Sequence, residues 1–403
     1  MKALLRLAMG VLLTELTFGF SAHTVAENGL PGDGNGKGSA PGIALNASWR
    51  LGAPVRFENL TVFPVIGDES PDVGGFITLD EGLRSGKVTL TEIGAKGRVR
   101  RIGAGRQASD DAEVNKLMLT NRSGKTLILI AGEMVVGGKQ DRIVGHDCLV
   151  ASNNIPVRLD VFCVEPGRWN EDAAFGQSRR VEQASASNVR RTTRGRTGRS
   201  GGSNWSLGGG NAGVSGSAAF MPAAGLTIAP SNVREKAQAS KDQTGVWAEV
   251  AKTEHENNTS SATGNLNAVF ADKQVSTRLE DYQRAFANTL TGKNVVGVVV
   301  AVGGKLRSAD VFATHSLFGI YWPKLLKSYS LEAASSGRAI GESISASAAE
   351  AFLSRAEGAK SPSGKARTYR LIEHQSDKDA SFELVNSSKP SLSLIHFNRV
   401  TKQ

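Results

Sequence analysis

The chain has 403 residues, of which 40% are hydrophobic, and 48 Lys and Arg against 38 Asp and Glu give a formal net charge of +10 at pH 7. The apolar content is enough for a core and only two cysteines occur, which excludes a fully disordered chain and a disulfide-stapled scaffold. The longest apolar run beyond the N-terminal segment, residues 295–302, is far shorter than the ~20 residues of a spanning helix. No transmembrane segment is therefore expected in the mature chain.

Residues 1–26 have the outline of a secretory signal peptide. Lys2 and Arg6 precede the apolar run 7–13, and small residues follow as far as Ala26. Glu15 is unfavourable in such a signal, so a cytoplasmic protein with an uncleaved N-terminal segment stays the alternative. We expect an exported, periplasmic or secreted protein in which a Gly/Pro-rich linker at 27–54 follows the signal.

Residues 55–176 are predicted to form the first half of a folded domain. Runs of β-branched residues separated by Gly, Asn and Asp predict strands at 57–66, 87–93, 114–120, 126–130 and 155–164. The turn Asn-Arg-Ser-Gly at 121–124 predicts that the third and fourth strands form a hairpin, because Asn and Gly tolerate positive φ. Thr78 and Glu81 have the spacing of a capping box, which predicts a helix at 78–85.

Residues 177–225 change abruptly to Arg, Ser, Gly and Ala without apolar periodicity, which predicts a disordered insertion. Between residues 178 and 200 seven arginines face one acidic residue, Glu182, so more than half of the net charge lies in this segment. Phosphate contacts with nucleic acid are the alternative function for these arginines. A solvated linker is favoured, and nucleic acid is not expected as a partner.

Residues 226–403 are predicted to form the second half of the domain. Periodicity predicts helices at 233–252, 277–290, 316–334 and 346–356, and strands at 294–302, 306–312, 367–372, 382–385 and 392–397. Gly303 and Gly304 join two apolar runs and predict a type I′ or II′ hairpin turn with Asp310 on the returning strand. The whole pattern predicts an α+β fold in which a β-rich first half with hairpins and a second half of helices and a two-stranded hairpin form one composite domain.

Residues that can carry chemistry concentrate in two segments, 131–143 and 163–169. Glu133 ends an apolar strand, and Gly137-Gly138 allows a sharp turn or the close approach of a ligand to the backbone. If the strands of the two segments are neighbours, charged and polar side chains converge with one indole. The residues concerned are Glu133, Lys139, Gln140, Asp141, Arg142, Glu165, Arg168 and Trp169.

Glu133 and Glu165 are the candidate catalytic residues, because a carboxylate can act as a general base. The candidate ligand-binding residues are Lys139, Gln140, Asp141, Arg142, Arg168 and Trp169: their cations suit phosphate or carboxylate groups, and the indole can stack on a base or sugar. The alternative is structural. Glu133 with Arg142, and Glu165 with Arg168, would then be ion pairs that tie strand ends together.

No metal or other cofactor is expected. The six histidines are scattered without i, i+4 pairing, and Cys148 and Cys163 do not form a C-x-x-C motif. A disulfide between these two cysteines and a pair of buried thiols are both open alternatives.

The same segments resemble a known family. GEMVVGGKQDRIV and VFCVEPGRW, with QTGVWAEV, YQRAF, VVGVVVAVGGKL and LFGIYWPKLLKSY further along, are similar to the ARG and Rhodanese-Phosphatase-superfamily-associated protein domain over about residues 57–397. The resemblance implies that both halves form one domain and that Gln243, Trp247 and Lys324 are comparable to motif positions. The family name, which records ADP-ribosylglycohydrolase, implies a role around ADP-ribose or related nucleotide metabolism.

Two functions follow as hypotheses. The first is a domain that binds or hydrolyses a phosphate-bearing small molecule, nucleotide-like or ADP-ribose-like. The alternative is an exported, non-catalytic interaction module whose charged cluster is structural. The first predicts a concave pocket lined by the cluster with unpaired polar groups, whereas the second predicts polar groups that satisfy one another.

Overall fold

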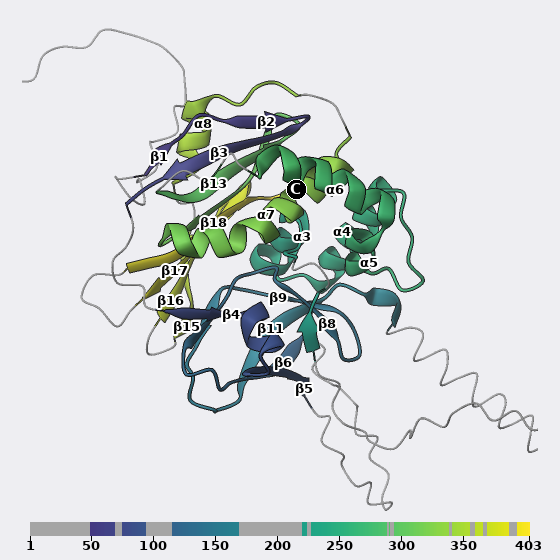
Figure 1. Cartoon of the computed structure of the whole chain (residues 1–403), viewed down its shortest axis with the longest axis vertical. Helices are drawn as coiled ribbons and strands as arrows, with labels where there is room; N and C mark the ends of the chain where they lie inside the picture. Colours follow the sequence, from purple (N-terminus) through teal and green to yellow (C-terminus); the bar gives the residue numbers. More distant parts are fainter. Residues whose placement is uncertain are drawn as a thin grey trace, which may run out of the picture. The chain divides into compact units, whose positions relative to one another are not determined.

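The computed structural model describes residues 49–68, 75–93, 115–168, 220–223, 227–287, 290, 294–337, 341–354, 359–365, 369–386 and 393–403 (Figure 1). The predicted signal segment, most of the predicted linker and insertion, and Trp169 lie outside these residues. Two predicted boundaries differ from the structure. Strand β1 (Arg50–Leu51) falls inside the predicted linker and strand β12 (Phe220–Pro222) inside the predicted insertion, because Leu51 and Phe220 pack against the core.

A large antiparallel sheet joins the two halves of the chain. Within the described residues its order is β1-β3-β13-β14-β18-β17-β16-β15, with β2 paired to β3. The further strands are β2 (Val55–Phe57), β3 (Leu60–Ile66), β13 (Val295–Val302), β14 (Lys305–Phe312), β15 (Ala359–Lys365), β16 (Tyr369–Gln375), β17 (Asp379–Asn386) and β18 (Ser393–Thr401). Because β3 from the first half pairs with β13 from the second, from Leu60↔Val302 to Ile66↔Val295, neither half can complete this sheet alone.

Strand β13 is buried along its whole length because both of its faces are covered. Val298 and Val300 pack with Leu325 of helix α7 (His315–Ser335), which lies across the sheet in Figure 1. On the other face Val299 packs with Phe352, which follows helix α8 (Ala346–Ala351). Burial on two faces explains why this strand is a continuous apolar run rather than an alternating one.

Two smaller sheets are built mainly from the first half. One has the order β10-β7-β4 and the other β12-β8-β9-β11-β6-β5. Their strands are β4 (Phe76–Thr78), β5 (Val88–Glu92), β6 (Lys116–Asn121), β7 (Thr126–Leu129), β8 (Met134–Gly137), β9 (Arg142–Val144), β10 (Cys148–Val150) and β11 (Val157–Cys163). Leu119, Leu127 and Val135 bring these sheets into one buried cluster.

The predicted hairpin at 121–124 is wrong, although the turn itself is present. β6 pairs with β5 and β11, whereas β7 pairs with β4 and β10, so the chain passes from one sheet to another at this turn. Asn121 holds it: the side chain accepts from the Ser123 N–H at 3.0 Å and donates to the Val150 carbonyl at 2.9 Å. A turn signal marks a chain reversal, but it does not choose the partner strand.

The helices agree with the predictions in part. Helix α1 (Leu79–Arg84) begins at Thr78, whose hydroxyl accepts from the Glu81 N–H at 3.4 Å, as predicted. The helix predicted at 233–252 is divided into α3 (Ser231–Glu235), a π-helical turn η1 (Lys236–Ser240) and α4 (Gln243–Glu256). It breaks because Asp242 caps α4, accepting from the Thr244 N–H at 2.9 Å. Helices α5 (Leu266–Ala271) and α6 (Lys273–Phe286) follow.

The β13–β14 hairpin agrees with its prediction. Gly303 and Gly304 have φ of 58° and 73°, the pattern of a type I′ turn, and Asp310 lies on the returning strand. In the part of the chain that the structure describes, no helix combines the length and the apolar character needed to cross a membrane. Helices and strands share one core, so the predicted α+β class is confirmed.

Candidate functional site

The two segments of the predicted site are neighbours, which meets the condition on which the predicted convergence depended. β9 and β11 are antiparallel partners with Arg142 opposite Cys163. Gly137 and Gly138, with φ of 118° and 58°, form the turn between β8 and β9. The predicted side chains nevertheless do not form one cluster: Glu133 contacts Lys324, whereas Glu165 contacts Arg168.

Glu133 is buried in a group of charges with Lys324. One of its oxygens lies 2.8 Å from Lys324 Nζ, and the other accepts from the Ile130 N–H at 3.0 Å. Lys324 also contacts the carboxylate of Asp80, so one ammonium serves two carboxylates. Burial raises the pKa of Glu133 in spite of Lys324. Burial alone would lower the pKa of Lys324, but the two carboxylates raise it above its usual value.

Glu165 lies in a second group. Its carboxylate accepts from the Asp141 N–H at 3.1 Å and from the Thr263 hydroxyl at 2.8 Å, and it forms an ion pair with Arg168 at 3.1 Å. Asp141 in turn accepts from the Asn265 side chain at 2.9 Å, and burial raises the pKa of Asp141. The ion pair that the structural alternative requires between Glu165 and Arg168 is present.

The remaining predicted residues extend along the β8–β9 turn. Gln140 donates to the Glu165 carbonyl at 3.2 Å. Buried Arg142 lies 3.7 Å from a Glu92 carboxylate oxygen, which also accepts from the Lys139 N–H at 3.0 Å. These contacts give Glu133, Glu165 and Arg142 protein partners. The catalytic and ligand-binding roles of the predicted residues stay predictions.

Replacing Glu165 with Gln should lower the free energy of unfolding by about 1–3 kcal/mol. The amide keeps the shape, but its NH₂ group must face one of the donors that the carboxylate now accepts from: the Asp141 N–H, the Thr263 hydroxyl or Arg168. Urea denaturation of Glu165→Gln and wild type measures the difference. Unchanged stability would argue against a structural role for this carboxylate.

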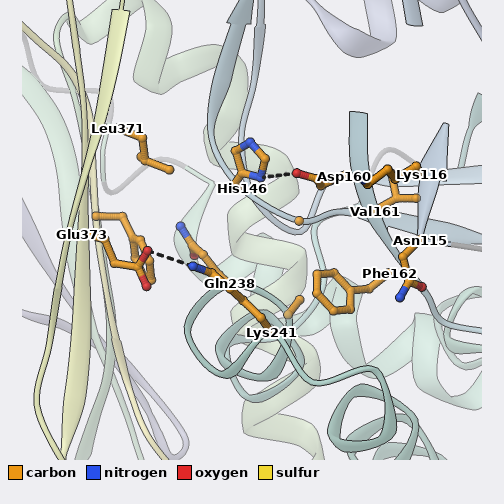
Figure 2. A pocket seen from close by; sticks show the side chains of 13 residues that line it. Asn115, Lys116, His146, Asp160, Val161, Phe162, Gln238, Lys241, Leu371 and Glu373 are labelled. Carbon is orange, nitrogen blue, oxygen red and sulfur yellow. Dashed lines mark hydrogen bonds and ion pairs between the residues drawn. The ribbon is translucent and has the colours of Figure 1, made fainter. Parts of the chain in front are cut away.

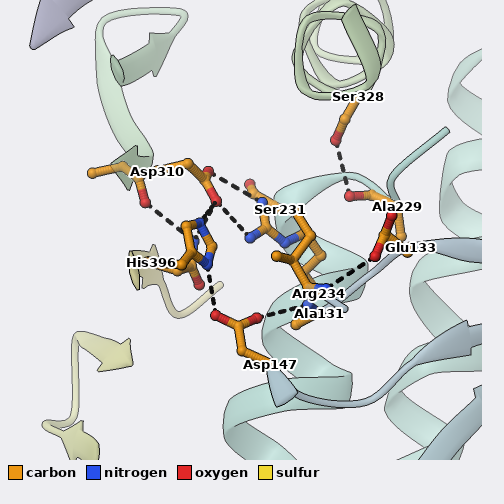
Figure 3. Close-up of polar contacts among 12 residues, drawn as sticks. Ala131, Glu133, Asp147, Ala229, Ser231, Arg234, Asp310, Ser328 and His396 are labelled. Carbon is orange, nitrogen blue, oxygen red and sulfur yellow. Dashed lines mark hydrogen bonds and ion pairs between the residues drawn. The ribbon is translucent and has the colours of Figure 1, made fainter. Parts of the chain in front are cut away.

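A third group of buried charges was not foreseen and centres on Asp310 (Figure 3). Arg234 of α3 forms two hydrogen bonds with its carboxylate, at 2.8 and 3.2 Å, and both side chains are 0% exposed. The Tyr329 hydroxyl and the Asn398 amide also donate to Asp310. Burial alone would raise the pKa of Asp310, but Arg234 and His396 hold it well below its usual range.

His396 links Asp310 to a second carboxylate. Its Nδ1 lies 2.6 Å from Asp147, whose other oxygen accepts from the Ala131 N–H at 2.7 Å, and its Nε2 lies 3.4 Å from Asp310. Burial alone would lower the pKa of His396, but Asp147 and Asp310 raise it to about 9. The imidazolium also stacks on Phe312 with 4.3 Å between ring centroids. This group ties α3, β14, β18 and the residue before β10 together.

A cavity of about 390 Å³ lies between η1, β11 and the β16–β17 pair (Figure 2). Its apolar lining comes from Val161, Phe162, Leu371, Phe382 and the methyl group of Ala237. Its polar lining comes from Asn115, Lys116, His146, Asp160, Gln238, Lys241 and Glu373. Segments from both halves of the chain therefore meet here.

Four ionisable side chains of this cavity lie in two pairs. His146 Nδ1 lies 3.8 Å from an Asp160 oxygen, and Lys241 Nζ lies 3.2 Å from a Glu373 oxygen. Lys116 adds a second lysine to the lining. Both cations and carboxylates are thus available beside an apolar wall.

The backbone at this cavity is irregular in two ways. η1 is a π-helical turn, a conformation that occurs frequently at functional sites. Lys241, which ends it, has φ of 53°, a left-handed conformation that is uncommon for a residue other than glycine. Strained backbone of this kind clusters at binding and active sites.

The predicted and observed candidate sites differ. Neither this cavity nor two smaller ones of about 240 and 100 Å³ has any of the predicted site residues in its lining. The sequence feature that marks this part of the chain is Asp242, an N-cap residue type inside the helix predicted at 233–252. Cys148 and Cys163 are free buried thiols, and burial raises the pKa of both, so neither suits nucleophilic chemistry. Across the described ranges no cluster of three His, Cys, Asp or Glu has a metal-binding arrangement.

Of three comparisons with known proteins, one finds a match. No curated protein and no solved structure matches the chain. A family model, described as the ARG and Rhodanese-Phosphatase-superfamily-associated Protein domain, matches residues 48–206 and 214–398. The match covers both halves of the large sheet, the buried charge groups and the cavity. The chain therefore belongs to the ARG and Rhodanese-Phosphatase-superfamily-associated Protein domain family.

Proposed function

We propose that the chain binds a nucleotide-like, phosphate-bearing small molecule of the ADP-ribose type in the cavity beside η1. The observation that carries the proposal is the composition of this cavity of about 390 Å³, in which an apolar wall faces two lysines and two carboxylates. Ligand pockets are typically about 300–1,000 Å³ and place a few polar groups against apolar walls. The family's association with ADP-ribosylglycohydrolase supports an ADP-ribose-linked ligand.

The lysines, carboxylates and aromatic side chains of the lining each suit a different part of such a ligand. Lys116 and Lys241 suit phosphate oxygens, since an ammonium donates charge-assisted hydrogen bonds. Asp160 and Glu373 can accept from ribose hydroxyls. Phe162 and Phe382 offer apolar surface to a base.

Binding is better supported than hydrolysis. Glu133 and Glu165, the candidate catalytic residues, have protein partners and are absent from the lining of this cavity. A general base has to lie within hydrogen-bond reach of the proton that it removes, directly or through one water. Incubation with ADP-ribose, followed by chromatography for released AMP, would detect hydrolysis.

A thermal-shift series with ADP-ribose, ADP and ribose 5-phosphate tests the proposal. A ligand that binds the native state raises Tm by mass action, and a concentration of 100 Kd adds about 2.7 kcal/mol of stability. ADP-ribose is expected to give a saturable increase in Tm. If none of the three compounds shifts Tm at millimolar concentration, the proposal is wrong.

Lys241→Asn should weaken binding of ADP-ribose about tenfold, the loss expected for one charge-assisted hydrogen bond. Asn tolerates the left-handed backbone at this position. It removes the ion pair with buried Glu373, so the ligand-free variant should have a lower Tm, and both affinities are compared below that Tm. Isothermal titration calorimetry measures both affinities. Lys378→Asn is the matched control, because Lys378 is an exposed lysine at the β16–β17 turn outside the cavity lining. Equal losses in the two variants would show a general charge effect instead.

A further inference from the structure

Among the described residues that line the cavity, Gln238 is the side chain that lacks hydrogen-bond partners for its buried polar atoms. It lies on η1, is 1% exposed and contributes to the lining. Among the described residues neither its Oε1 nor its Nε2 has a hydrogen-bond partner. The large majority of buried side-chain polar atoms have one, because leaving such an atom unpaired costs free energy. A whole buried amide without partners therefore needs an explanation.

Gln243 shows that a glutamine in this part of the fold can be satisfied. Its Oε1 accepts from the Cys163 N–H at 2.9 Å, and its Nε2 donates to the Cys163 carbonyl at 2.8 Å. This amide uses its adjacent acceptor and donor on a backbone unit that offers the complementary pair. Gln238, five residues earlier, lines the cavity and has no such backbone partner for either amide atom among the described residues.

We propose that the Gln238 carboxamide recognises the adenine base of the bound nucleotide, a deeper statement that rests on the function proposed above. Its Oε1 would accept from the exocyclic amino group, and its Nε2 would donate to the adjacent ring nitrogen. A glutamine side chain pairs with adenine in this bidentate way because both present one donor beside one acceptor in a plane. Phe162 and Phe382, which line the same cavity, offer apolar surface to the ring faces.

Figure 2 places Gln238 between the strand of Glu373 and the side of the cavity formed by His146 and Asp160. Gln238 lines the cavity and is 1% exposed, so its amide is buried. Base recognition at a buried amide is discriminating, since a base without the matching donor leaves the amide unpaired.

The test is a cycle of two ligands and two proteins, measured by isothermal titration calorimetry. The ligands are ADP and purine riboside 5′-diphosphate, which lacks the exocyclic amino group. The wild-type protein should prefer ADP about tenfold, the loss expected for one hydrogen bond with its buried partner left unpaired. Gln238→Met should remove this preference by weakening ADP binding and leaving the analogue nearly unchanged. Gln238→Glu, which keeps the acceptor and removes the donor, should also weaken ADP binding.

Thermal melts of the ligand-free proteins form the second measurement. Gln238→Met removes two unpaired polar atoms and should raise Tm, whereas Gln243→Met, the matched control, unpairs the backbone of Cys163 and should lower Tm. If Gln238 is kept for binding at a cost in stability, the two variants should change Tm in opposite directions.

Two outcomes distinguish failure of base recognition by Gln238 from failure of the proposed function. If the wild type binds ADP and Gln238→Met keeps the tenfold preference, base recognition by Gln238 is overturned while the proposed function stands. If the wild type binds neither ADP nor ADP-ribose, the proposed function fails and this inference fails with it.

Discussion

Replacement of Arg234 with Met is expected to lower the free energy of unfolding by about 3–5 kcal/mol, the cost of leaving a buried charge without its partner. Arg234 and Asp310 are both 0% exposed and share two hydrogen bonds, so the variant leaves the Asp310 carboxylate buried without its guanidinium. Urea denaturation followed by circular dichroism measures the change.

Two further variants make this prediction specific. Arg284→Met removes an arginine that pairs with Asp281 on the surface, and it should change stability by less than about 0.5 kcal/mol. Adding Asp310→Asn to Arg234→Met should recover part of the loss, because the stranded charge is then absent. If the single variant costs no more than the surface control, the buried pair does not hold the fold.

The Arg234–Asp310 ion pair also bears on the cavity, because it holds the helix that precedes η1. Arg234 lies in α3, and the next turn of the chain is η1, which carries Gln238 and leads to Lys241. Gly132 permits the arrangement: it has φ of 87°, and a Cβ there would lie 2.7 Å from Arg234 Cγ. The buried ion pair therefore fixes the element on which the candidate binding residues are mounted.

Stability is expected to decrease by about 3 kcal/mol as pH rises from 6.5 to above 9, through the titration of His396. Its folded-state pKa is raised to about 9 from the ordinary value of 6.5 by Asp147 and Asp310, and each pKa unit corresponds to about 1.4 kcal/mol. A group with a raised folded-state pKa contributes its full stability below the unfolded-state value and loses it as pH passes the folded-state value. The stabilisation is thus complete below pH 6.5.

Urea titrations at pH 6, 7, 8, 9 and 10 measure this profile. His396→Gln should be less stable than wild type at pH 6 and should lose the decrease between pH 6.5 and 9. His255→Gln is the control, because His255 is an exposed histidine near the end of α4, and this variant should keep the profile of the wild type. A wild-type profile that is flat over this range would contradict a charged, buried His396.

The sequence by itself determined the local structure of this protein. The Thr78 cap, the Gly303-Gly304 turn and the continuous apolar run of β13 all specify their elements, since caps, positive φ and burial periodicity depend on residues close together in the chain. The motif residues of the family are likewise local, which is why the family could be predicted and was confirmed by the match over residues 48–206 and 214–398. The sequence did not predict that β9 and β11 pair; the predicted convergence of the site residues only assumed it.

Only the tertiary structure decided which distant groups meet. The Asn121 turn predicted a reversal, but β6 and β7 pair in different sheets, although Leu119 and Leu127 are buried in one shared core. Asp147 and His396 pair across 249 positions, and neither residue has a sequence feature that marks the other. The cavity is assembled from η1, β11 and β16, which are not contiguous. Pairing between such segments is decided by how apolar faces are buried together, a property of the whole fold that no local pattern encodes.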